Sequence, residues 1–154
     1  MPRPRHHGPV VTTYVARRPS SASWLDAYAS RLFQARSEHE IAEALLAATC
    51  AIVPRGGAVY RGGLRIAATG SGLAFPRTDD GAPASSLRLD SNALTLVADA
   101  APHVPGSAIA KLLYDVVDLA ATTLEALERR TLMRERLRTL AHRVEGVEGT
   151  ADPV

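Results

Sequence analysis

The sequence lacks several features that would place it in common classes of protein. It has a single cysteine, Cys50, which excludes an internal disulfide and is typical of a reducing compartment. Its apolar runs, such as 44–48, are far too short to cross a membrane. The first nine residues have no apolar core of the kind that secretory signals need. We therefore expect a cytoplasmic protein, and a length of 154 residues with 46% apolar residues indicates one domain.

Proline and glycine are both missing between Ser107 and Glu145. Apolar residues recur there at steps of three and four, which predicts one long helix of about 55–60 Å, with Ser107 as its N-cap. Such a helix is longer than a small domain needs, so we expect it to continue as a two-chain coiled coil. The apolar positions are Ile109, Leu113, Val116, Val117, Ala120, Leu124, Leu127, Met133, Leu137, Leu140 and Val144.

Lysine is nearly absent, and the net charge of +2 comes from arginine. The second half of the long helix carries Arg129, Arg130, Arg134, Arg136, Arg138 and Arg143 interleaved with Glu128 and Glu135. These charges either flank a coiled-coil seam or form a basic ridge that follows nucleic-acid phosphates. The interleaved acids would repel a polyanion, which favours the coiled coil.

Residues 1–19 contain four arginines, four prolines and no acid. This composition predicts a flexible basic arm, in which residues 10–15 could pair with a sheet edge. The arm is either a contact for nucleic acid or a partner, or a solvated tail.

Two short helices are predicted before residue 57, where the spacing of the apolar residues changes. The first starts after Ser23 as N-cap and has a stripe of Leu25, Tyr28, Ala29, Leu32 and Phe33. The second starts with a capping box, in which the side chain of Ser37 caps the backbone amide of Glu40 and the side chain of Glu40 reaches back to the backbone amide of Ser37. It ends at Pro54, and we expect Cys50 to be a buried structural thiol.

From Gly57 onward the apolar residues recur at every second position, which is the spacing typical of strands. Residues 57–69 predict a hairpin around Gly62-Gly63, with Leu64, Ile66 and Ala68 on one face, opposite Arg65. Residues 70–84 predict a loop, and 87–97 a second hairpin with its turn at 90–92. The result is an α+β domain over 20–146, with a four-stranded antiparallel sheet and helices on one face, followed by a disordered tail over 147–154.

Over residues 37–128, the order of the predicted elements and the pattern of apolar positions and turns resemble those of a GAF domain. GAF domains are small sensor modules of bacterial signalling proteins. The resemblance lies in the helix 41–53, the hairpin 57–70, the hairpin 87–98 and the Leu-rich closing helix from 107. It implies a sheet that can cup a small molecule and terminal helices that pair with those of a second subunit. Residues that would line such a pocket are Tyr60, Ile66, Phe75, Leu87, Leu96 and His103. Residues that would form the dimer interface are Leu25, Leu32, Leu124, Leu127, Met133, Leu137, Leu140 and Val144.

This sequence departs from the family between the two hairpins. Family members place a further helix and strands there, whereas this chain has about fifteen loop residues. The Asn-Lys-Phe-Asp-Glu set of cyclic-nucleotide binders is not present, and the cysteines of the sulfoxide reductases and bilin carriers of this fold are missing. We therefore expect a shortened member that serves assembly or protein contact.

No catalytic, metal or cofactor site is predicted. Gly70-Ser71-Gly72 follows a strand without opening a helix, and Asp79-Asp80 has too few acidic neighbours to hold a cation. His39 and His142 are expected at the surface. The hypothesis is a non-enzymatic regulatory module of bacterial signalling or transcriptional control that forms a homodimer. The alternatives are a nucleic-acid-associated regulator and a small-molecule sensor.

Overall fold

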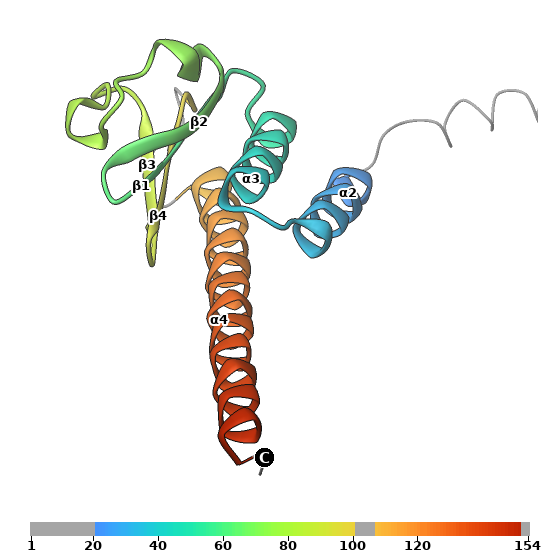
Figure 1. Ribbon diagram of the computed structural model, residues 1–154. Coiled ribbons are helices and arrows are strands. Elements are labelled where there is room, and N and C mark those ends of the chain that lie inside the picture. Colours follow the sequence, from blue (N-terminus) through green and yellow to red (C-terminus); the bar gives the residue numbers. More distant parts are fainter. Residues whose placement is uncertain (1–20, 101–106, 152–154) are drawn as a thin grey trace, which may run out of the picture.

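The computed structural model describes residues 21–100 and 107–151. The predicted arm over 1–19, with its strand at 10–15, lies outside the described residues, and so do His103 and residues 152–154. The order of elements confirms the α+β class, with a four-stranded antiparallel sheet and one long C-terminal helix (Figure 1). The elements are α2 (Ser21–Gln34), α3 (Glu38–Ile52), β1 (Gly56–Arg61), β2 (Leu64–Gly70), the 3₁₀ helices η1 (Ser71–Ala74) and η2 (Asp79–Gly81), β3 (Leu87–Ser91), β4 (Leu94–Ala98) and α4 (Ala108–Ala151).

The sheet consists of two hairpins joined side by side, in the order β2-β1-β4-β3. In the first hairpin Gly62 and Gly63 have φ angles of 59° and 83°, as a two-residue turn with left-handed residues requires. The second turn lies at Asn92-Ala93, not at 90–92, because Asp90 and Ser91 still pair with Thr95 and Leu94. Asn92 has a φ of 50°, a conformation that asparagine tolerates.

A bulge in β2 changes which residues face the helices. Val59 pairs with Ala67 and Tyr60 with Arg65, so Ile66 is an extra residue without a partner across the strand pair. Ile66 and Ala67 both pack against the helix-covered core, while Ala68 packs on the opposite face. The prediction that Leu64, Ile66 and Ala68 share a face is therefore wrong at Ala68, because an inserted residue shifts the alternation by one.

The main core lies between the sheet and a layer of two helices. α3 covers β1 and β2, α4 covers β3 and β4, and α2 packs outside against α3 and α4. Ile41, Leu45 and Leu113 are almost completely buried there, and each such side chain stabilises the fold by about 1.5–3 kcal/mol. The Tyr28 hydroxyl donates a hydrogen bond of 2.6 Å to the carbonyl oxygen of Val116, and burial raises the pKa of Tyr28.

The outer face of the sheet is closed by residues 71–86, a segment that includes most of the predicted loop 70–84 and contains η1 and η2. Tyr60 is fully buried beneath this loop among small and aromatic side chains, and its hydroxyl donates to the carbonyl oxygen of Pro76 at 2.8 Å. Arg65 donates to the carbonyl oxygen of Phe75 at 2.6 Å. Gly72 permits the close approach, since a Cβ atom there would lie 1.9 Å from the carbonyl oxygen of Gly57.

The helix caps in the structure agree only in part with the caps predicted from the sequence. The Ser37 hydroxyl accepts from the amide of Glu40 at 3.2 Å, while Glu40 accepts from the amide of Arg36 and not from that of Ser37. Helix α2 already begins at Ser21, so the predicted N-cap at Ser23 is wrong. Serine is tolerated within a first turn at little energetic cost, so Ser23 does not fix the start of the helix.

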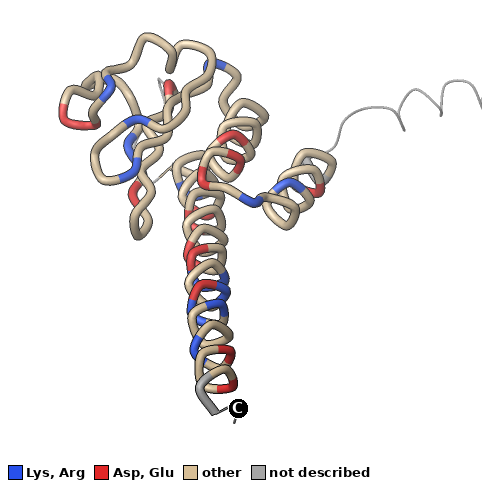
Figure 2. Tube along the Cα trace, viewed as in Figure 1, with Lys and Arg blue, Asp and Glu red and all other residues tan. Residues whose placement is uncertain are grey.

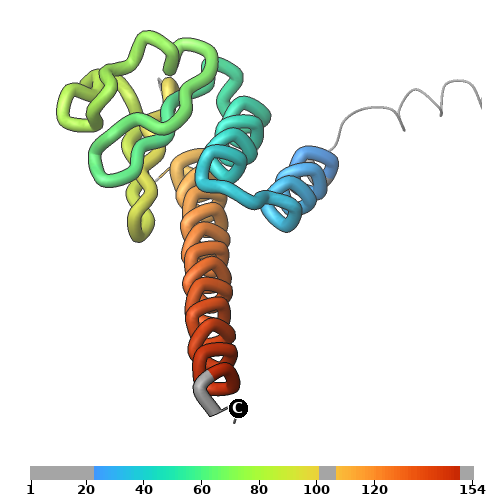
Figure 3. The backbone as a smooth tube through the Cα atoms, viewed as in Figure 1, coloured from blue at the N-terminus to red at the C-terminus, as the bar shows by residue number. Residues whose placement is uncertain are grey.

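Helix α4 passes from the domain into solvent without a break. The Ser107 hydroxyl accepts from the amide of Ala110 at 3.2 Å, which confirms the predicted N-cap. Figures 1 and 3 show α4 extending well beyond the sheet, α2 and α3. It also continues through Gly146 and Gly149 to Ala151, so the predicted end at 146 is too early. Its 44 residues span about 66 Å.

Candidate functional site

The main feature of α4 is an apolar seam with a strict seven-residue repeat. Heptad positions a and d, three and four residues apart in turn, follow one side of the helix over its whole length. The a positions are Ile109, Val116, Thr123, Arg130, Leu137 and Val144, and the d positions are Leu112, Leu119, Ala126, Met133, Leu140 and Val147. A straight helix drifts by about 20° per heptad, so a repeat kept for six heptads is typical of a helix that coils around a partner.

The seam overlaps the buried face of α4 only in its first half, where the seam residue Val116 is buried in the chain's own core. Leu113, Val117 and Leu124 are buried in the chain's own core, and all of them lie beside the seam and not in it. Along the projecting half, the seam residues are between 48% and 65% exposed: Met133, Leu137, Leu140, Val144 and Val147. A continuous exposed apolar stripe of this kind marks an interaction surface.

An apolar groove lies where the seam passes α2. It has a volume of about 730 Å³ and is bounded by Phe33 on α2 and by the seam residues Leu119, Ala126 and Met133 on α4. Phe33 is 89% exposed, more than any other large apolar side chain of the described residues. The small residues Thr123 and Ala126 leave the floor of the groove open. The remaining lining residues are Ala29, Leu32, Thr122, Arg129 and Arg130.

The predicted dimer interface is only partly at the surface. Leu32 and Leu124 are buried within the chain itself, so they stabilise the domain and are not available to a second copy. Leu127 is half-buried and packs against the same core. The other predicted interface residues are exposed: Leu25, Met133, Leu137, Leu140 and Val144.

Charges on the projecting half are divided between two sides of the helix. Arg129, Arg134 and Arg136 occupy the e and g positions that flank the seam, while Glu128 and Glu135 occupy the opposite f positions. Figure 2 shows the basic residues concentrated in the middle of α4, with acidic residues above and below. The sequence alone suggested interleaved charges; the heptad register shows that Glu128 and Glu135 lie away from the side that carries Arg129, Arg134 and Arg136.

The predicted small-molecule pocket does not form. Tyr60 and Phe75 lie on the outer face of the sheet, where they pack together under the loop. Leu87, Leu96 and Ile66 lie on the other face, against the helices. Tyr60 lies on the other face from Leu96 because Leu96 pairs with Val59, the neighbour of Tyr60, and the β2 bulge places Ile66 on the helix-covered face as well. Tyr60, Leu87 and Leu96 are all buried by the chain's own side chains.

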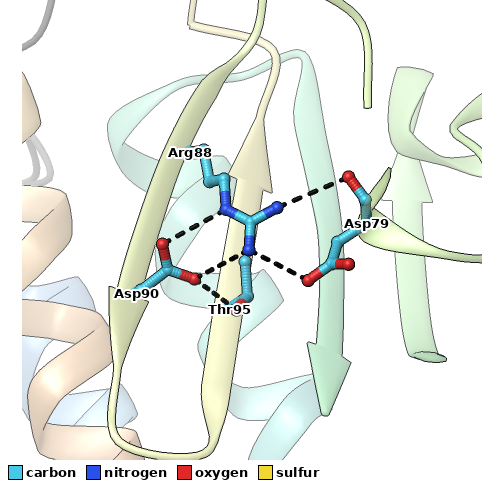
Figure 4. A network of polar contacts seen from close by, with 4 residues as sticks. All are labelled: Asp79, Arg88, Asp90 and Thr95. Carbon is cyan, nitrogen blue, oxygen red and sulfur yellow. Dashed lines mark hydrogen bonds and ion pairs between the residues drawn. The ribbon is translucent and has the colours of Figure 1, made fainter. Parts of the chain in front are cut away.

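Two arginine networks hold the domain together. Arg88 on β3 contacts the carboxylates of Asp79 and Asp90, at 3.0 and 3.2 Å, and Thr95 donates to Asp90 at 2.5 Å (Figure 4). Burial alone would raise the pKa of Asp90, but the hydrogen bonds from Thr95 and Arg88 outweigh it and lower that pKa. The network fastens the η2 loop to the sheet, which is a structural role.

Arg61 forms the second network, at the point where α4 leaves the domain. Its guanidinium contacts Glu38 at the start of α3 and Glu128 of α4, the latter at 2.5 Å. The hydrogen bonds that Arg61 donates to the carboxylates of Glu128 and Glu38 raise the pKa of Arg61. The first hairpin, α3 and α4 are therefore joined by one side chain.

The described residues contain no group of three or more metal-ligating side chains close enough to hold a metal ion. None of the described helices combines the length and the apolar character that a membrane crossing needs. Cys50 is half-buried, and His39 and His142 are exposed beside Glu43 and Glu145, as expected for surface histidines.

Comparisons with protein-family models, curated proteins and solved structures give no match to this chain. The fold class therefore rests on the structure, and the resemblance to GAF domains stays a prediction.

Sequence reasoning missed the α2–α4 groove and the role of Arg61. The groove depends on how α2 sits against α4, which no local pattern encodes. A signal for the seam was present, because the residues at steps of seven are apolar at nearly every a and d position.

Proposed function

We propose that this chain is a non-enzymatic regulatory module that pairs with a second copy of itself through the α4 seam, with α2 along the edge of the interface. The observation that carries the proposal is the exposed heptad seam of the projecting half, from Met133 to Val147. Burial of these side chains by a second copy would remove this apolar stripe from water.

The groove supports the same pairing. Its floor consists of seam residues, so a helix seated on the seam would also cover the groove and contact Phe33. By two-fold symmetry, α2 of each copy would lie against α4 of the other, and the interface would be a four-helix layer. The output of the module would then be a relative movement of the paired α4 helices between Leu124 and Val144.

The test is the oligomeric state of the full chain, measured by sedimentation equilibrium over a range of concentrations. We expect a dimer that Leu137→Glu weakens by about a thousandfold, because the substitution places two carboxylates opposite each other in the seam. The matched control is Leu132→Glu, since Leu132 is 47% exposed but lies at position c, outside the seam. A monomer at all concentrations, or equal effects of the two substitutions, would contradict the proposal.

A nucleic-acid-associated regulator is the second candidate, and the position of Arg129, Arg134 and Arg136 on one side of α4 favours it. Duplex DNA would then bind with a steep salt dependence, and deletion of residues 1–19 would weaken that binding. Salt-independent or undetectable binding of duplex DNA by the full chain would exclude this candidate.

A further inference from the structure

Four arginines gather where the seam leaves the domain. Arg129 and Arg136 are at g positions, Arg130 at a, and Arg134 at e, so all four lie in or beside the seam. All are exposed, and within the described ranges none of them makes an ion pair with a carboxylate. Arg61 and Arg88, in contrast, are both paired with two carboxylates. We call this group of four residues the Arg collar.

The arrangement of the seam favours a parallel, in-register pair. The heptads run from Leu112 near the start of α4 to Val147 near its end, and the groove beside Phe33 lies over the middle of them. An antiparallel pair that overlapped the projecting halves would leave Leu112, Leu119 and the groove uncovered. A parallel pair covers all of them.

In a parallel pair, the Arg collar of one copy faces the Arg collar of the other copy. Position a faces position a of the second copy, and position g faces the following position e. Arg130 therefore meets Arg130, and Arg129 meets Arg134, which brings eight guanidinium groups together within about two helical turns. Further along, Arg143 meets Glu148, so opposite charges meet only beyond the collar.

We propose that a multivalent oxyanion, of the chemical class of sulfate, pyrophosphate and phosphate esters, binds between the two α4 helices at the Arg collar and thereby controls their pairing. This inference rests on the proposed homodimer. The guanidinium group presents a planar set of donors that matches oxyanions in two-pronged hydrogen bonds, which suits it to this ligand class. Repulsion across the collar weakens the pair, and a bound anion both removes the repulsion and bridges the two copies.

Two residues of the Arg collar also line the groove. Arg129 and Arg130 line one end of the groove, next to Thr122 and Thr123. Both threonine hydroxyls donate to backbone carbonyl oxygens of their own helix, those of Asp118 and Leu119. The guanidinium groups are therefore the donors that the groove offers to an anion.

The experiment measures the dimer dissociation constant of the full chain by sedimentation equilibrium in sodium chloride and in sodium pyrophosphate, both adjusted to an ionic strength of about 0.15 M. We expect pyrophosphate to tighten the dimer by about tenfold beyond the effect of screening. Arg130→Leu should tighten the dimer in chloride and reduce the additional effect of pyrophosphate. The matched control is Arg138→Gln, which removes a charge at position b, outside the collar, and should leave the effect of pyrophosphate intact.

The outcomes separate the two proposals. A monomer in every buffer overturns the homodimer and the collar with it. A dimer with equal dissociation constants in chloride and pyrophosphate leaves the homodimer intact and overturns the collar. If pyrophosphate and sulfate have no effect while duplex DNA tightens the dimer, the collar is a nucleic-acid contact and the small-oxyanion site is wrong.

Discussion

The two halves of α4 show how one continuous helix can serve two purposes. Residues 108–127 present apolar side chains over a broad surface, and the sheet and α3, with a smaller contribution from α2, bury most of it. Residues 128–149 are exposed on all sides, and apart from Leu132 their large apolar side chains lie on the narrow a/d stripe. A broad apolar surface is typical of a helix in a domain core, whereas a two-position stripe is typical of a coiled-coil seam. The width of the apolar stripe therefore distinguishes the half of α4 that packs within the domain from the half that we expect to pair with a second copy.

The halves also differ in what stabilises them. The first half is fixed by tertiary packing within the chain. The second half has no such packing, and Arg130, Arg134 and Arg138 repel one another at four-residue spacing along the helix. Isolated helices of this length are marginal in water, so we expect the stability of the second half to depend on protein concentration.

The largest expected effect is in the first half. Leu113→Ala should lower the free energy of unfolding by about 3 kcal/mol, because Leu113 is fully buried and the substitution leaves a cavity. Denaturant unfolding at two protein concentrations should give the same loss at both. Leu112→Ala, at the adjacent exposed seam position, is the control and should change the unfolding free energy by less than about 1 kcal/mol. Equal losses would show that the core and the seam are not separate.

In the second half, Leu140→Ala should weaken the dimer by about tenfold and leave the unfolding of the domain unchanged at low concentration. Leu140 is 55% exposed and is not part of the buried core of the described residues, so in the proposed dimer only the second copy would bury its side chain. Leu132→Ala serves as the control outside the seam. A fall in the stability of the monomeric domain would contradict the division of α4 into two halves.

A smaller effect is expected where the halves meet. Arg61→Met should lower the free energy of unfolding by about 1 kcal/mol, because it leaves Glu38 and Glu128 without their shared partner. Hydrogen exchange should show faster opening of α4 near Glu128. Arg77→Met, at an exposed arginine in the loop, should change neither quantity. Unchanged exchange near Glu128 would show that Arg61 does not couple the halves.

The smallest effect concerns pH and involves only the domain. The pKa of Asp90 is lowered in the folded chain, so its contribution is present above the unfolded pKa of about 3.9 and is lost as pH falls through the folded value. We expect a loss of at most about 0.5 kcal/mol, since the side chain is half-exposed. Asp90→Asn should remove this part of the acid dependence of unfolding. An unchanged acid profile in that variant would mean that Asp90 contributes nothing.

Much of the fold was predictable from local signals. Interactions between residues close in the sequence determine the Gly62-Gly63 turn, the Ser37 and Ser107 caps and the alternation of the strands. The β2 bulge was not predictable, because it is a choice of register between strands and not a property of one strand. The predicted stripe of α2 was half right: Tyr28 and Leu32 are buried, but Phe33 is exposed. Which side of α2 faces the core depends on the placement of α3 and α4.

The Arg88 network has a consequence for how copies of this chain avoid one another. β3 is an edge strand of the sheet, and edge strands with unpaired backbone groups invite other chains to add to them. Arg88 and Asp90 place fixed charges along that edge, and an incoming strand would have to strip both of water. Stacking of sheets into open-ended fibres is thereby opposed, which leaves the α4 seam as the surface through which the proposed homodimer would form.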